Sequence, residues 1–236
     1  QFPVHVICTE LCDGTLDDYL IDSVSITHDE YMSILIQIVF MLGAYQHMFL
    51  FTHNDLHTHN IVHVHTDEPF LYYQWQGIVY RVPTFGKIYK IIDFGRAIYH
   101  FREKRYCSSD FAKGNDAYTQ YNTEPFFNED KPRVEPNFSF DLTILACSLI
   151  GCLESRDADD KKYQTNDETD KNKKKEGEEK EDDICAVVYT REPLSERDVI
   201  KKIINEWCTD DDGRHVVYKA SGKERYEGFK LYKMVA

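Results

Sequence analysis

The chain has 236 residues, 42% of them hydrophobic and 14% aromatic, which suits one large domain or two small ones with a buried core. With 28 basic and 41 acidic side chains its net charge is −13, which argues against nucleic acid as a partner because phosphate contacts need clustered Lys and Arg. We find no apolar run that approaches the length of a membrane span, so we expect no membrane-spanning segment and no membrane partner.

The cysteine pattern favours a reducing compartment. Seven cysteines are present, an odd number, and no two of them form a CxxC pair. A disulfide framework or a zinc ribbon is therefore not expected, and we predict an intracellular, cytoplasmic protein without a secretory signal. The chain opens at Gln1 without an initiator Met, and we interpret this start as a cut edge.

The first third of the chain predicts a strand followed by two helices. The β-branched residues of 4–10 favour a strand. Thr15 precedes acidic residues and predicts a helix N-cap. Thr27, with Glu30 three residues later, forms a capping box, and the apolar stretch 34–50 has the length of a helix.

The middle of the chain predicts an extended hairpin. Residues 61–62 and 89–92 have the composition of short strands, and in 72–83 between them Gln76 and Gly77 predict a turn. Farther along, 138–153 predicts a buried helix capped near Asn137 or Ser139.

The last third alternates ordered and polar segments. Residues 154–183 are strongly charged and predict a disordered insertion, since they bury too little apolar area to offset chain entropy. A helix is expected over 194–208 with Ser195 as its N-cap, and the aromatic-rich tail 225–232 is expected to pack against the domain.

Two short runs carry the chemistry. Asp55 and Asn60 lie five residues apart in the run His53-Asn54-Asp55-Leu56-His57-Thr58-His59-Asn60, and Asp93-Phe94-Gly95 ends a predicted strand. Transfer of a γ-phosphoryl group needs a base for the attacking hydroxyl and hard oxygen ligands for Mg²⁺. One loop with an Asp and an Asn, and a second Asp beside a permissive Gly, supply these groups.

This ordered set resembles the catalytic loop and the metal-binding motif of protein kinases. The run from Ile7 to Leu16 is similar to the kinase hinge, and Asp141 in Phe140-Asp141-Leu142 is similar to the residue that ties down the catalytic loop. The resemblance implies an α+β, kinase-like fold: a mainly α-helical C-lobe with small β-hairpins that lacks the β-rich N-lobe. It implies ATP and Mg²⁺ as cofactors and Ser or Thr of a protein as the substrate.

The resemblance also assigns roles. Asp55 would be the catalytic base, His53 a brace of the loop, and His57 a donor toward the transferred charge. Asn60 and Asp93 would hold Mg²⁺. The backbone of Glu10 and Cys12 would bind adenine, with Thr9 at the back of the pocket and Val62 as its apolar floor.

The same resemblance makes the whole chain, 1–236, one catalytic lobe. The sequence does not indicate its oligomeric state. Its parts are the hinge 4–16, the catalytic loop 53–60, the extended hairpin 61–92, the activation segment 93–136, the acidic insertion 154–183 and the C-terminal helices 184–236.

Two departures from the kinase pattern keep alternatives open. Asn54 replaces the usual Arg, which puts control by activation-loop phosphorylation in doubt and admits an inactive pseudokinase or binding module. His57 replaces the usual Lys, as in small-molecule phosphotransferases that act on choline or aminoglycosides. The long hairpin, together with Tyr121 and Asn122, resembles kinase-like proteins of large DNA viruses, which would place the protein in the cytoplasm of a host cell.

A zinc site is a further alternative, because five of the ten histidines lie within 53–65. No Cys lies near them, and we interpret the alternation of His63 and His65 as a surface pattern.

Overall fold

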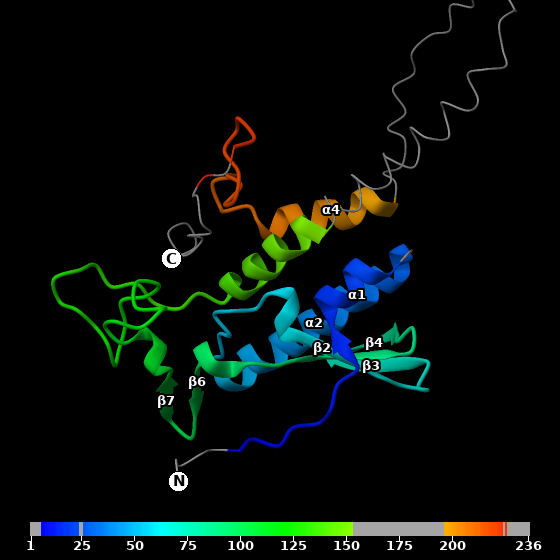
Figure 1. Cartoon of the computed structure of the whole chain (residues 1–236), viewed down its shortest axis with the longest axis horizontal. Coiled ribbons are helices and arrows are strands. Elements are labelled where there is room, and N and C mark those ends of the chain that lie inside the picture. The colour runs from blue at the N-terminus through cyan, green and yellow to red at the C-terminus, as the bar shows by residue number, and fades with distance from the viewer. Residues whose placement is uncertain (1–5, 24–25, 153–195, 224, 226–236) are drawn as a thin grey trace, which may run out of the picture.

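The computed structural model describes residues 6–23, 26–152, 196–223 and 225. Helices and small antiparallel sheets make this part of the chain α+β, as predicted (Figure 1). In chain order the elements are β1 (Gly14–Thr15), α1 (Leu16–Asp22), α2 (His28–Phe49), η1 (Thr58–Asn60), β2 (Ile61–His65), β3 (Phe70–Trp75), β4 (Ile78–Pro83), β5 (Lys87–Ile91), η2 (Phe94–Arg96), β6 (Ile98–Phe101), β7 (Lys104–Cys107), η3 (Ser109–Phe111), the helix Ser139–Cys152 and α4 (Glu196–Trp207).

Both predicted N-caps at the start of the chain are confirmed, but the Glu30 carboxylate, which a capping box would use, contacts Tyr19 and Lys87 instead. The Thr15 hydroxyl accepts a hydrogen bond from the backbone N–H of Asp18 and begins α1. The Thr27 hydroxyl accepts one from the N–H of Glu30 at 3.2 Å and begins α2. Each cap satisfies a backbone donor that the first helical turn leaves without an intrahelical partner.

Helix α2 lies in the centre of the main core. Its buried side chains Ile34, Leu35 and Ile38 belong to one cluster with residues of α1, β5, the helix Ser139–Cys152 and α4. Figure 1 shows Ser139–Cys152 and α4 lying along one another on one side of α2, and the strands lie on its other side. The helix predicted over 194–208 is thus confirmed as α4.

The expectation that no apolar run reaches the length of a membrane span is wrong in its premise. Among the residues that the structure describes, the 22-residue helix α2 is long and apolar enough to cross a membrane by those two criteria. Its apolar character has a packing explanation in this structure: Ile34 and Ile38 lie in the core, and the buried Ser33 and Gln37 hydrogen-bond to the backbone of Pro83 and to that of Tyr89, respectively.

The predicted extended hairpin is confirmed and consists of two antiparallel strand pairs, one after the other along the hairpin. The outer part pairs β2 with β5, Ile61 opposite Ile91, and β1 adds to the free edge of β2. The inner part pairs β3 with β4 around a turn at Gln76 (φ 48°) and Gly77 (φ 80°). A turn with positive φ at both central residues matches the twist of the strands.

The strand expected over 4–10 is not found in its described part. Residues 6–12 form no strand, and Ile7 and Leu11 are 85% and 93% exposed. β-Branched residues favour an extended backbone, but a strand also needs a neighbouring strand for its hydrogen bonds. The described part of the chain offers 6–12 no such neighbour.

Other expectations lie outside the described residues. They concern residues 4–5, the charged segment 154–183, the cap at Ser195 and the tail beyond Arg225.

Candidate functional site

The loop that carries Asp55 connects α2 to β2 and is fixed to two other segments. The backbones of Thr52 and Ile98 exchange two hydrogen bonds of 2.9 Å. The N–H of Ile92 donates to the carbonyl of Asn60 at 3.0 Å. The loop therefore contacts Ile92, just after β5, and Ile98, at the start of β6. The run Asp93-Phe94-Gly95 lies between these two contacts in the chain.

Asp141 fastens this loop to the helix Ser139–Cys152. Its carboxylate is fully buried and accepts the backbone N–H groups of His53 and Asn54, both at 2.8 Å. Burial raises the pKa of Asp141 to about 6, and the two N–H donors oppose that rise. These contacts confirm that Asp141 ties down the loop.

His53 braces the loop from inside. Its ring is fully buried, and Nε2 lies 2.9 Å from the carbonyl oxygen of Ile92. Burial lowers the pKa of His53, which favours the neutral ring. Because a carbonyl can only accept, the proton of the neutral ring is assigned to Nε2. Nδ1 is buried and has no hydrogen-bond partner in the described part of the chain.

Asn54 joins the loop to Arg96 and Tyr121. It is 2% exposed and has a left-handed backbone (φ 68°). Its amide nitrogen lies 2.8 Å from the carbonyl oxygen of Arg96 and within 3.2 Å of two oxygens of Thr52. Its amide oxygen accepts the hydroxyl of Tyr121 at 2.7 Å. The residue that departs from the kinase pattern is therefore a buried structural link.

Asp55 is partly exposed and contacts Arg96 and Asn60. Its carboxylate is 30% exposed and lies 3.3 Å from Nη1 of Arg96. The amide nitrogen of Asn60 donates to the Asp55 carbonyl at 2.9 Å and lies 3.3 Å from Nε2 of His57. Since both contacts use the nitrogen of Asn60, its side-chain oxygen is the atom suited to a cation.

Asp93 is exposed and has a left-handed backbone (φ 61°, ψ 70°). Its carboxylate accepts the N–H of Gly95 at 3.2 Å. A Cβ at position 95 would lie 3.0 Å from that carboxylate oxygen, closer than side chains normally come. Glycine at 95 therefore allows this turn, which leaves the second Asp93 oxygen toward solvent.

The donor set of Asn60 and Asp93 fits Mg²⁺ in kind. Mg²⁺ prefers oxygen ligands and is usually held by one or two carboxylates together with water and phosphate oxygens. In the described ranges, no group of three or more His, Cys, Asp or Glu side chains is placed to hold a metal. Two protein oxygens would thus need the phosphates of a nucleotide to complete the coordination.

The candidates for nucleotide contact lie in β2 and in the segment before β1. Val62 is buried in β2, opposite Thr15 of β1, and the segment with Thr9, Glu10 and Cys12 leads into β1. Thr9 and Glu10 are exposed, and the carboxylate of Glu10 pairs with Lys90 of β5. The Glu10 carbonyl, one of the predicted adenine contacts, lies 3.9 Å from the Cys12 thiol.

The five clustered histidines point to different surroundings. His53 is buried, His63 packs between the rings of Tyr19 and Tyr89, and His65 lies 3.3 Å from Asp67. The rings of His57 and His59 have centroids 5.7 Å apart. We therefore propose no zinc site.

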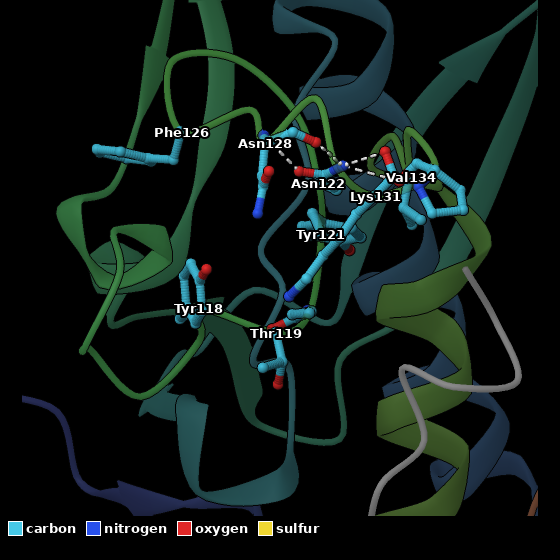
Figure 2. A pocket seen from close by; sticks show the side chains of 10 residues that line it. Tyr118, Thr119, Tyr121, Asn122, Phe126, Asn128, Lys131 and Val134 are labelled. Atoms are coloured by element: carbon cyan, nitrogen blue, oxygen red, sulfur yellow. Dashed lines mark hydrogen bonds between the residues drawn. The ribbon is translucent and has the colours of Figure 1, made fainter.

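A cavity of about 550 Å³ lies next to the loop, in the segment 118–134 (Figure 2). Figure 2 shows Lys131 extending toward Thr119 and Tyr118, and its Nζ lies 5.3 Å from the centre of the Tyr118 ring. Asn122 holds the wall by hydrogen bonds to the backbone of Asn128 and to two further carbonyls. Through Tyr121 and Asn54 this wall is joined to the loop that carries Asp55.

The sequence did not predict two residues of the site, Arg96 and Asp17. Arg96 pairs with Asp55, and the only signal was its position directly after Gly95. Asp17 of α1 accepts the hydroxyl of Thr58 at 2.5 Å and lies 3.4 Å from His59, a contact across 41 residues that no local pattern indicates.

A comparison with protein-family models finds no match to this chain, and a search of curated proteins finds none either.

Proposed function

We propose that the chain carries the catalytic residues of a protein kinase-like phosphotransferase that moves phosphate from Mg-ATP to Ser or Thr hydroxyls of a protein. One arrangement supports this most. The loop with Asp55 and the strand end before Asp93 are joined by two hydrogen bonds, from Ile92 N–H to Asn60 O and from His53 Nε2 to Ile92 O. A base and a metal-type carboxylate thus project from one rigid unit.

In this proposal each residue has a defined task. The exposed carboxylate of Asp55 accepts the proton of the attacking hydroxyl and orients it. The side-chain oxygen of Asn60 and the carboxylate of Asp93 would hold Mg²⁺, which neutralises charge on the phosphates when bound. Asp141 and His53 keep the loop in place from the buried side.

Position 57 supports a second candidate. His57 lies beside Asn60, and a neutral or protonated imidazole there matches the loop of small-molecule phosphotransferases. Choline or an aminoglycoside would then accept the phosphate in place of a protein. The kinase-type hinge and the run Asp93-Phe94-Gly95 favour the protein substrate.

The test is phosphate transfer from γ-labelled ATP by the 236-residue chain, offered casein-type proteins, choline and aminoglycosides in parallel. Asp55→Asn should abolish transfer, while Asp67→Asn, a fully exposed carboxylate outside the site, should leave it unchanged. Undiminished transfer by Asp55→Asn would contradict the proposal. Calorimetry tests for a binding module without activity. Such a module would bind ATP in the presence of Mg²⁺, lose that binding in Asp93→Ala and show no turnover.

A further inference from the structure

Arg96 brings a positive charge to Asp55. Its Nη1 lies 3.3 Å from Oδ1 of Asp55, and the two side chains are about equally covered, 32% and 30% exposed. An Arg remains charged at any physiological pH, and its planar guanidinium presents donors in fixed directions. It is therefore able to fix the orientation of a carboxylate.

The backbone of Arg96 is held by the same loop. Its carbonyl accepts the amide of the buried Asn54 at 2.8 Å. The N–H of Ala97 closes η2 on Phe94, and Ile98 then pairs with Thr52. The guanidinium thus starts from a fixed point next to Asp93, and its reach to Asp55 is not left to a flexible loop.

A second carboxylate lies on the other side of the guanidinium. Oδ2 of Asp110, in η3 of the activation segment, lies 3.7 Å from Nε of Arg96. At that distance the contact is an ion pair without a short hydrogen bond. Arg96 therefore lies between Asp55 and Asp110 of η3, and η2 packs against η3.

The charges around Asp55 give a physical reason for a cation at position 96. Asp55 and Asp93 are both acidic, and the phosphates they would approach are negative as well. The neighbouring His53 is buried with a lowered pKa and supplies no positive charge. Arg96 is the cation that the structure places against the Asp55 carboxylate.

We propose that Arg96 is the positioning residue for Asp55, and that Asp110 couples this pair to η3. Arg96 holds the Asp55 carboxylate in the direction needed to accept a hydroxyl proton. This inference rests on the proposed function, because it assigns the residue that orients the proposed base.

Steady-state phosphate transfer by the 236-residue chain tests it. Arg96→Ala should lower kcat roughly 30-fold or more while KM for ATP changes by less than about threefold, because a positioned base contributes roughly 10²–10⁴ in rate. Arg96→Lys should keep kcat within about tenfold of wild type, since it retains the charge and loses the fork geometry. Asp110→Asn should have a smaller effect, and Arg102→Ala, at the tip of the β6–β7 hairpin, should have none.

A relocated charge separates positioning from mere structural support. His57 and Asp55 share one loop, and Asn60 contacts both of them. His57→Lys should therefore restore part of the kcat that Arg96→Ala loses, roughly fivefold or more, because an ammonium group at position 57 offers the Asp55 carboxylate another donor to orient it. A purely structural role for Arg96 would not respond to a cation at position 57.

A double-mutant cycle in urea unfolding provides an independent measurement. The unfolding equilibrium constant of Asp55→Asn with Arg96→Ala should differ from the product of the single effects by about threefold or more. Additive effects in this cycle, or a kcat of Arg96→Ala equal to that of wild type, would overturn the Arg96 inference while Asp55→Asn remains inactive. Absence of transfer by the wild-type chain would overturn the proposed function, and the role of Arg96 with it.

Discussion

Replacing Asn54 by Ala should destabilise the protein by about 4 kcal/mol. The substitution removes the hydrogen bonds that hold the Arg96 carbonyl and the Tyr121 hydroxyl. A buried group left without its partner costs about 1–3 kcal/mol, so these two groups account for about 3 kcal/mol. The left-handed backbone of residue 54 (φ 68°) adds about 1 kcal/mol, because Asn tolerates that conformation better than Ala.

Two further variants divide that total. Asn54→Gly removes the same hydrogen bonds but adopts positive φ without strain, so it should be about 1 kcal/mol more stable than Asn54→Ala. Tyr121→Phe removes one hydrogen bond and leaves the Asn54 oxygen without its donor, which should cost about 1–2 kcal/mol.

Urea unfolding monitored by circular dichroism gives the free energy of unfolding for each variant. An Asn54→Ala variant within about 0.5 kcal/mol of wild type would refute the interpretation of Asn54 as a structural link. So would an Asn54→Gly variant less stable than Asn54→Ala, because the backbone argument requires the opposite order.

Two other predictions concern pH and backbone conformation. Burial raises the pKa of Asp141 from 3.8 to about 6, so its contribution is fully present below about pH 4 and about 3 kcal/mol of stability is lost as pH rises through 6. Asp141→Asn should remove this pH dependence. The measurement is the free energy of unfolding in urea at pH 4, 5 and 7, and an equal change of that free energy with pH in both proteins would contradict the prediction. Gly77→Ala should cost about 1 kcal/mol because φ is 80° and no atom lies within 4 Å of the added Cβ, which leaves strain as the sole cause. Gly43→Ala, inside α2 with Trp75 at 3.9 Å as its nearest neighbour, should instead stabilise by about 0.5–1 kcal/mol; thermal melts that move both variants in the same direction would refute the comparison.

Local signals in the sequence predicted the elements that depend on near neighbours. Thr15 and Thr27 cap helices because each accepts an N–H three residues away. Gln76 and Gly77 form the hairpin turn because adjacent residues with positive φ suffice for it. Such interactions involve a few consecutive residues, so the sequence displays them directly.

The strand expected over 4–10 is not formed in its described part, 6–10, for the opposite reason. Its β-branched residues set a backbone preference, but strand formation depends on a partner that lies elsewhere in the chain or outside it. The apolar length of α2 is equally ambiguous from sequence, since a core helix and a membrane span share it.

The sequence by itself predicted three side chains of the candidate site: Asp55, Asn60 and Asp93 stand in the order and spacing on which the proposed phosphoryl transfer rests. Only the tertiary structure decided how they are held. Asp141 reaches the loop across 88 residues, Tyr121 meets Asn54 across 67, and Arg96 pairs with Asp55 across 41. Such contacts arise when the hydrophobic core brings distant segments together, and the spacing of residues along the chain contains no measure of that distance in space.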